Sequence, residues 1–279
     1  MIIQHNMTAY NTNRQLGITN GNLAKSSEKL SSGYRVNRAG DDAAGLSISE
    51  KMRGQIRGLE QASTNAQDGI SLIQTAEGAL NEIHAILQRQ RELTVQAAND
   101  TNVDVDRQAI KDELDQLSSE ITRIACETEF NTMKLLDGTG ADGSGGFTFQ
   151  VGANKEQSIS LTISGMAADS VGEDGVDVSD IGVTDYATAT ESIETVNNAL
   201  ESVSKQRSKL GAVQNRLEHT IANADNTAEN LQAAESRIRD IDMTEEMVKY
   251  SKDSILQQAA QSMLAQANQA NQGVLSLLQ

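Results

Sequence analysis

The residue types that most often carry out chemistry are few in this chain and lie far apart. The histidines are His5, His84 and His219, and the single cysteine is Cys126. None of the histidines belongs to a His-Glu-x-x-His metal motif, and no histidine in the segment around Cys126 would activate its thiol. We therefore interpret His84 as a packed helix residue and Cys126 as a half-buried helix residue.

One glycine-bounded segment, GDDAAG at 40–45, is a candidate anion site. A phosphate-binding loop uses backbone N–H groups together with a lysine followed by Ser or Thr. This segment has neither residue and places Asp41 and Asp42 where a phosphate would sit, so we interpret it as a turn between helices. The sequence predicts a protein that is not an enzyme and that needs no cofactor or metal.

The composition favours long helices over a globular core. The chain has 279 residues, no Pro, no Trp, 3% aromatic residues and a formal net charge of −16. The absence of Pro permits uninterrupted helices, and a single cysteine excludes an internal disulfide framework. The acidic balance, without any basic stripe carrying interleaved aromatic residues, argues against nucleic-acid binding.

Both ends of the chain lack charge. Residues 1–13 and residues 254–279 contain no Lys, Arg, Asp or Glu. The carboxyl-terminal run mixes small apolar residues with Gln, Asn and Ser, so it is too polar to span a membrane and too uncharged for a solvated helix. We expect both ends to pack against protein.

Apolar residues recur at strict intervals of seven along the amino-terminal end. One apolar residue per heptad is a thin stripe, which cannot offset an ordering cost of about 1–2 kcal/mol per residue. We therefore expect the terminal helices to fold only on assembly. Basic residues predominate in 1–35 and acidic residues in 240–279, which favours pairing of the two ends. The stripe is Ile2, Ala9, Leu16, Leu23 and Leu30, and the complementary seam positions are Asn13, Asn20 and Ser27.

Three longer helices are predicted in between. From Met52 to Leu87 apolar residues recur at the 3.5-residue period of a coiled coil. Residues 99–102 break this helix, and a second seam over 110–124 should return antiparallel to the first. A third helix begins at a capping box formed by Thr188 and Glu191 and extends to 241.

The region between the second and third helices has a different character. Glycine is concentrated over 138–182, and apolar residues alternate over 147–151 and 159–163, which indicates a β-hairpin. Residues 165–183 are predicted to be a loop. The expected fold is mainly α, an elongated antiparallel helical rod of coiled-coil type with a small β-hairpin. We expect four parts, residues 1–44, 45–185, 186–240 and 241–279.

Four segments resemble the bacterial flagellin family. The longest, EKLSSGYRVNRAGDDAAGL at 28–46, closely resembles the amino-terminal signature of that family. QRQREL at 88–93, EFNTMKLL at 129–136 and the run from NRLE at 215–218 to the carboxyl end agree with it. The resemblance covers residues 1–165 and 185–279 and leaves only a short central stretch unmatched.

This resemblance implies a subunit of an extracellular filament used for motility. Family members are exported unfolded through the flagellar secretion channel, without a cleaved signal peptide, and they polymerise beneath a cap protein. An export chaperone is an implied partner, and so are further copies of the chain. The terminal segments form the inner tubes of the filament, and the positions expected to pack there are Ile2, Leu16, Leu23, Leu30, Leu256, Leu264 and Leu275.

The family also carries a surface that the vertebrate Toll-like receptor for flagellin recognises. The matching positions are Arg89, Leu93 and Glu113. We expect them to form one exposed patch that also packs against the next subunit, because Leu93 follows the regular apolar seam. Gln90 departs from the family, where related sequences often have an apolar residue.

Two other interpretations remain. The family includes flagellins with an inserted protease, but this chain has neither the insertion nor its motif. A hook–filament junction protein, or another secreted coiled-coil component of the flagellar axis, would share the chemistry of both ends. Seeded growth into long filaments would distinguish a flagellin from these.

Overall fold

The structure, a computed structural model, describes residues 6–140, 143, 145–171 and 176–276, with side chains described as far as residue 269. Its contacts divide the chain into two compact units, residues 1–54 with 229–279, and residues 55–228. The predicted mainly helical fold with a small hairpin is confirmed. The elements are α1 (Met7–Ser32), α2 (Ala43–Ala97), α3 (Asp104–Glu127), β1 (Glu129–Phe130), β2 (Met133–Lys134), β3 (Gly146–Gln150), β4 (Ser158–Thr162), α4 (Tyr186–Arg239) and α5 (Met243–Ser276).

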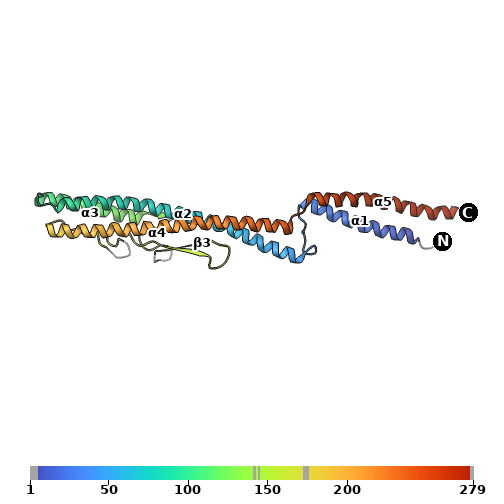
Figure 1. The fold of residues 1–279 in the computed structure, drawn as a ribbon, viewed down its shortest axis with the longest axis horizontal. Coiled ribbons are helices and arrows are strands. Elements are labelled where there is room, and N and C mark those ends of the chain that lie inside the picture. The colour runs from blue at the N-terminus through green and yellow to red at the C-terminus, as the bar shows by residue number, and fades with distance from the viewer. Residues whose placement is uncertain (1–5, 141–142, 144, 172–175, 277–279) are drawn as a thin grey trace. The chain divides into compact units, whose positions relative to one another are not determined.

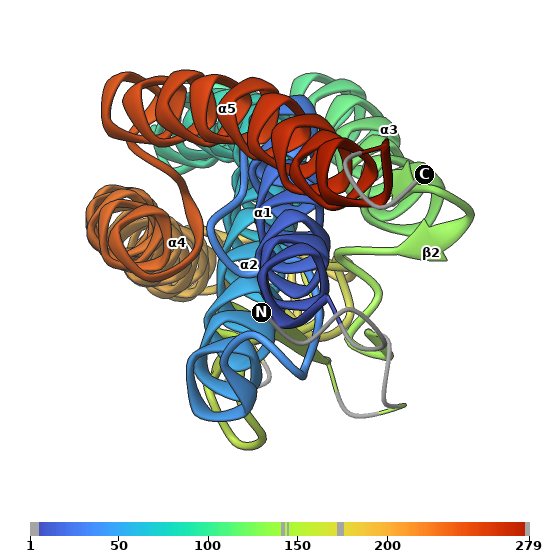
Figure 2. The same ribbon diagram turned by 90° about the vertical axis from the view of Figure 1, so that its right-hand side faces the viewer.

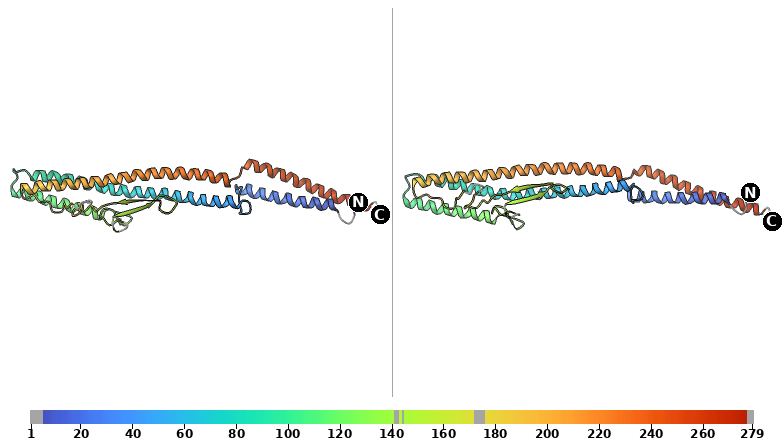
Figure 3. Two further views of the ribbon diagram at one scale, coloured as in Figure 1. Left: turned by 60° about the horizontal axis from the view of Figure 1, so that its bottom comes forward. Right: turned by 90° about the horizontal axis from the view of Figure 1, so that it is seen from below.

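The unit formed by residues 55–228 has a continuous hydrophobic core. In it the described parts of α2, α3 and α4 lie side by side (Figures 1 and 3). The break predicted at 99–102 is confirmed, because α2 ends at Ala97 and α3 begins at Asp104. Apolar residues at helical spacing on all three helices face inward, as the sequence pattern requires. The largest fully buried side chains on them are Ile73, Leu80, Ile83, Leu87, Leu114, Ile121, Leu210 and Leu217.

The predicted hairpin is present and lies against α2. β3 and β4 are antiparallel, with Phe147 opposite Leu161. The hairpin approaches α2 closely at glycines. A Cβ placed on Gly69 would lie 3.2 Å from the ring of Phe149, and one on Gly58 would lie 2.7 Å from the Cβ of Ala153. Glycine at these two helix positions therefore permits the packing, at the usual cost in helix propensity.

The predicted loop over 165–183 has no helix or strand in its described part, yet it belongs to the core. Met166, Val178, Ile181 and Val183 are each at most 2% exposed. Backbone bonds hold the segment, with the Met166 N–H donating to the Leu136 carbonyl at 2.8 Å. The short β1–β2 ladder before it was not among the predicted elements.

The predicted capping residue of α4, Thr188, is wrong by three residues. The helix begins at Tyr186, and Asp185 occupies the position before it. The Thr188 hydroxyl accepts from the Asp185 N–H at 3.0 Å and donates to the Asp185 carbonyl at 2.9 Å. Thr188 thus lies inside the first turn as a partner of the capping residue.

The other unit contains an antiparallel pair formed by α1 and α5 (Figures 1, 2 and 3). The Asn6 side chain donates to the Ala267 carbonyl at 3.0 Å. Further along, the Gln257 amide donates to the Asn20 side chain at 2.8 Å. The expected pairing of the two ends is therefore present within one chain, whereas folding of these helices only on assembly stays a prediction.

The seam of this pair differs from the one predicted. Leu16, Leu23 and Leu30 are half-buried in it, but Asn13, Asn20 and Ser27 are exposed. A seven-residue repeat fixes one seam position, but the second can lie either three or four residues after it. In the structure it is three residues on, where small hydroxyl residues let the helices approach. These are Thr12, Thr19 and Ser26.

Two of the residues expected in the inner packing, Ile2 and the side chain of Leu275, lie outside the described part. Among the described residues, no helix is long and apolar enough to cross a membrane.

Candidate functional site

The exposed side of α5 is an uncovered apolar surface. We call it the α5 outer face and define it as Met243, Met247, Val248, Ile255, Leu256 and Met263, which are between 46% and 67% exposed. The first five of these, with Thr244, Ser251 and Lys252, line an open hollow of about 790 Å³. A row of large apolar side chains in water marks an interaction surface.

This face exists because α5 uses other residues to contact α1. Gln257 and the Ala267 carbonyl form hydrogen bonds across the pair. The buried or half-buried side chains of α5 are Glu246, Tyr250, Asp253, Ser254, Gln257, Ala260, Leu264 and Ala267. Small residues allow close packing of two helices, and the larger apolar residues remain outside. Of the tail residues expected to pack in the filament interior, Leu264 is half-buried and Leu256 belongs to the outer face.

A groove runs beside the outer face, between α5 and α1. Its volume is about 360 Å³. One wall is polar and comes from α1, and the other wall is mainly apolar and comes from α5. The lining residues are Asn11, Thr12, Gln15 and Thr19 on α1, and Leu256, Ala259, Ala260 and Met263 on α5. The groove extends the uncovered apolar surface toward α1.

The signature at 28–46 builds the turn that follows α1. Gly33 ends α1 in the left-handed conformation, with φ of 76°, which favours glycine. Its carbonyl accepts from the Ile241 N–H at 3.1 Å, and the Arg35 N–H donates to the Arg239 carbonyl at 2.7 Å. Backbone pairing thus fixes the start of α5 beside the end of α1.

Arg239 adds side-chain contacts to this turn. Its guanidinium lies 4.6 Å from the centre of the Tyr34 ring, and it forms an ion pair with Glu50 at 2.9 Å. The hydrogen bond from Arg239 is the main cause that lowers the pKa of the Glu50 carboxyl below its ordinary value of 4.5. These contacts join the turn after α1 to the end of α4 and to the first part of α2.

The two acidic residues of the candidate anion loop bind backbone N–H groups. Asp41 accepts from the Arg38 N–H at 3.1 Å and the Asn37 N–H at 3.3 Å, and the bond from Arg38 is the main cause that lowers its pKa. Asp42 accepts from the Gly45 N–H at 2.8 Å, at the start of α2. The interpretation as a turn between helices is confirmed.

The expected recognition surface on α2 and α3 is present only in part. Arg89 forms ion pairs with Glu113 at 3.0 Å and with Glu92 at 3.1 Å, and about half of the Arg89 side chain is exposed. The bond with Glu113 is the main cause that raises the pKa of Arg89. The prediction that Leu93 belongs to the exposed patch is wrong, because Leu93 is 2% exposed. The apolar seam of α2 does not stop at Leu87.

Gln90 is the residue that continues this seam, and sequence reasoning missed its role. It is fully buried, and its amide donates to the Ser118 hydroxyl at 2.9 Å and weakly to the Leu114 carbonyl at 3.4 Å. Its Oε1 atom has no hydrogen-bond partner. The available signal was its position, three residues from both Leu87 and Leu93.

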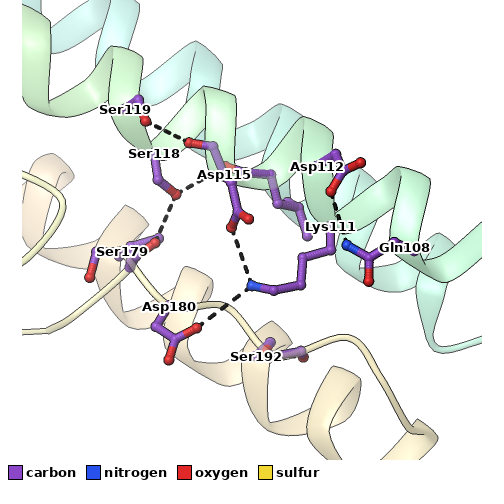
Figure 4. A network of polar contacts seen from close by, with 12 residues as sticks. Gln108, Lys111, Asp112, Asp115, Ser118, Ser119, Ser179, Asp180 and Ser192 are labelled. Carbon is purple, nitrogen blue, oxygen red and sulfur yellow. Dashed lines mark hydrogen bonds and ion pairs between the residues drawn. The ribbon is translucent and has the colours of Figure 1, made fainter.

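Polar contacts connect α3 to the segment over 165–183, which has no helix or strand in its described part and which we call the irregular segment. The Ser118 hydroxyl lies 2.9 Å from the Val178 carbonyl. Lys111 lies between Asp115 at 3.3 Å and Asp180 at 3.6 Å, as Figure 4 shows. These contacts hold the buried part of the irregular segment in place beneath the helices.

The isolated candidates for chemistry do not gather into a site. His84 is half-buried on α2, as expected, and His219 is exposed on α4. Cys126 is exposed rather than half-buried, because it lies on the solvent side of α3 next to buried Ala125. His5 lies outside the described residues. Within the described part, no group of three or more His, Cys, Asp or Glu side chains could hold a metal ion.

Comparisons with known proteins agree with this structure. The bacterial flagellin N-terminal helical region matches residues 3–141, and the bacterial flagellin C-terminal helical region matches residues 193–278. A flagellin of Halalkalibacterium halodurans is 56% identical over 278 residues, with 100% of both chains covered. A flagellar filament 33 kDa core protein of Treponema phagedenis is 52% identical over 285 residues, again with 100% of both covered.

Solved structures show the same fold. The crystal structure of Bacillus cereus flagellin is 31% identical with a TM-score of 0.50, over 62% of this chain and 94% of that one. A putative flagellar hook-associated protein from Vibrio parahaemolyticus shares the fold at 13% identity and a TM-score of 0.60, over 72% and 100% of the two chains. The helical matches at both ends and the full-length relatives decide the assignment. The chain belongs to the bacterial flagellin family and is a structural subunit of the flagellar filament.

Proposed function

We propose that the α5 outer face is the surface through which copies of this chain polymerise into an extracellular filament for motility. The observation that carries the proposal is the row of large apolar side chains left uncovered on α5. Burial of one such side chain contributes about 1.5–3 kcal/mol. Several together are comparable to the about 4–15 kcal/mol that association costs in lost freedom.

The test replaces Ile255, which is 67% exposed, with Asp. A charge without a partner in an apolar interface costs several kcal/mol, so seeded filament growth should fall by roughly a hundredfold or more. The monomer should keep its helicity, because an exposed Asp costs a helix less than about 1 kcal/mol. Growth is measured by electron microscopy and light scattering of purified monomer seeded with filament fragments.

Val105→Asp is the matched control, because Val105 is 77% exposed and lies on α3 in the other unit. It introduces the same charge in place of a similar aliphatic side chain. Normal growth of Val105→Asp beside failed growth of Ile255→Asp supports the proposal. Equal growth of both variants would show that the α5 outer face is not the interface.

A second role is proposed for the exposed ion pair of Arg89 and Glu113. We infer that this pair contacts a neighbouring subunit in the filament and is recognised by the vertebrate Toll-like receptor for flagellin in the monomer. Support comes from the resemblance at 88–93 and from the exposure of about half of each side chain. Leu93 has no direct part in this role, because it is buried in the core and does not reach the surface.

The corresponding experiment uses the double variant Arg89→Ala, Glu113→Ala. Leu93 is left unchanged, since its truncation would damage the core. The control is Arg123→Ala, Glu120→Ala, which removes another exposed ion pair on α3, at 2.6 Å. The first variant should lose receptor signalling in a reporter-cell assay and grow filaments slowly, whereas the control should do neither. Full signalling and normal growth of the first variant would remove this role.

The remaining partners follow from the family. We propose export through the flagellar channel without a cleaved signal peptide, with an export chaperone as partner and a cap protein at the growing end. Residues 1–44 and 241–279 would act as the inner-tube parts, and residues 45–185 and 186–240 as the rod. The alternative, a hook–filament junction protein, predicts that seeded monomer fails to extend into micrometre-long filaments.

A further inference from the structure

We propose that the methionines of α5 are a modification site for peroxides, and that their oxidation to sulfoxide blocks assembly. The inference rests on the proposed role of the α5 outer face. It concerns Met243, Met247 and Met263, which supply half of that face and are 48%, 50% and 61% exposed. According to this proposal, peroxide oxidises a surface of the monomer that neighbouring copies would cover in the filament.

The positions of these sulfur atoms make them accessible to a small oxidant and place them in the proposed assembly surface. Met243 and Met247 line the hollow together with Val248, Ile255 and Leu256. Met263 lines the groove between α5 and α1 on the other side of Leu256. A thioether in such a place is open to a small oxidant in the monomer, and it would lose that access when another copy covers the face.

The chemistry transfers one oxygen atom. A peroxide gives an oxygen to the thioether sulfur, so the O–O bond breaks and a sulfur–oxygen bond forms. Sulfur is oxidised by two electrons, and the second oxygen of hydrogen peroxide leaves as water. The product is a polar, chiral side chain in place of a flexible apolar one, and methionine sulfoxide reductases reverse the change.

The consequence for assembly follows from burial. A polar group buried without a hydrogen-bond partner weakens an apolar interface by at least about tenfold. Each sulfoxide on the outer face would be covered by a neighbouring copy in an apolar interface, which offers it few donors. Oxidised monomer should therefore be excluded from the filament while its fold is retained.

Met166 and Met7 provide internal standards among the other methionines, and the leucine variant below accounts for oxidation at Met1 and at the half-buried Met52 and Met133. Met166 is fully buried in the core and should stay reduced as long as the protein is folded. Met7, on α1, is 68% exposed, and Cys126 is also exposed, so both would be oxidised without belonging to the α5 outer face. The test is therefore made in a background with Met7→Leu and Cys126→Ser.

The experiment treats full-length monomer of this background with hydrogen peroxide and maps sulfoxides by mass spectrometry. Seeded growth is then measured before treatment, after treatment, and after repair with both methionine sulfoxide reductases. We expect oxidation at the three α5 methionines, at least about tenfold slower growth, and recovery on repair. Circular dichroism should be unchanged throughout. In preformed filaments the same methionines should be oxidised at least about tenfold more slowly.

A matched variant adds Met243→Leu, Met247→Leu and Met263→Leu, which keeps the apolar volume and removes the sulfur atoms. Its growth should be insensitive to peroxide. Normal growth of fully oxidised monomer would overturn the proposal, as would an equal loss of growth in the leucine variant. If the leucine variant does not grow untreated, the repair experiment decides alone. The Ile255→Asp result tests the assembly face separately, so failure of the oxidation proposal leaves that role standing.

Discussion

In residues 55–228, the leucines and isoleucines of three helices are buried against one another, whereas most of the large apolar side chains of α5 are exposed. Val36 is the one hydrophobic side chain that is buried in the described part of the terminal unit, residues 6–54 and 229–269. The other unit buries a continuous cluster of leucines, isoleucines and valines. The same chain thus encloses one core by itself and leaves the α5 outer face uncovered, which is the surface that we propose its own copies cover.

The difference teaches where each unit obtains its stability. Burial of apolar area is the main favourable contribution to folding, and the entropy of ordering opposes it. In residues 55–228, α2, α3 and α4 bury enough apolar area against one another within a single molecule. The pair of α1 and α5 has backbone and side-chain hydrogen bonds but little enclosed apolar area, so its stability should depend on what covers α5.

The largest expected contrast is in local opening. Amides of α1 and α5 should exchange within seconds to minutes in dilute monomer, whereas amides of α2 and α3 near Leu114 should be protected close to the global limit. Limited proteolysis should leave a core of about residues 45–240, because untethered ends are cleaved first. Hydrogen exchange with mass spectrometry measures this. Strong protection of residues 7–32 in the monomer would erase the contrast.

Truncation of one leucine in each unit should separate them by several kcal/mol. Leu114→Ala should lower the free energy of unfolding by about 2–5 kcal/mol, because Leu114 is fully enclosed. Leu23→Ala, at a half-buried seam position, should cost about 1 kcal/mol or less. Denaturant unfolding followed by circular dichroism gives both values. Similar losses for the two variants would mean that α1 and α5 form a core of their own.

A smaller effect is expected at Gln90, where the core contains a polar residue. Gln90→Leu should raise the free energy of unfolding by about 1 kcal/mol, since it removes the buried Oε1 atom that has no partner. Gln90→Ala is the control and should lower it, because it leaves a cavity between α2 and α3. Thermal unfolding of both variants measures the difference. Destabilisation by leucine as well would show that the bond to Ser118 outweighs the unpaired oxygen.

The smallest expected effect is a pH dependence of the turn that follows α1, where backbone bonds join it to the residues before α5. The pKa of Glu50 is lowered by Arg239, so its contribution to stability is complete above the ordinary value of 4.5 and is lost as pH falls through the lower folded value. Exchange of the Arg35 and Ile241 amides should therefore accelerate below about pH 4 beyond the intrinsic trend. Glu50→Gln should remove that acceleration. An unchanged pH profile in the variant would assign it to another acid.

The sequence was informative where large apolar residues repeat. The period from Met52 to Leu87 predicted α2, and alternation around Phe147 and Leu161 predicted the hairpin, because these patterns require one buried face. It failed where small or polar residues do the packing. Thr12 and Thr19 carry no apolar signal, so the seam of α1 was placed one residue too far along.

The candidate surfaces show the same limit. The proximity of Arg89 and Glu113 followed from two antiparallel helices joined by a short turn. The burial of Leu93 did not, because Gln90 interrupts the apolar series and makes the seam look finished at Leu87. Buried valines at 178 and 183 lie in a segment with no periodicity at all, so only tertiary contacts reveal their place in the core.

The burial of that irregular segment matters for anyone who wishes to display a foreign peptide on this chain. Segments without helix or strand usually accept insertions, since they run over the surface. Here the run from Val176 to Val183 fills part of the core, and an insertion at Val178 would displace its contact with Ser118. The turn at Lys155 and Glu156, whose side chains are 92% and 82% exposed, is the better place for a graft.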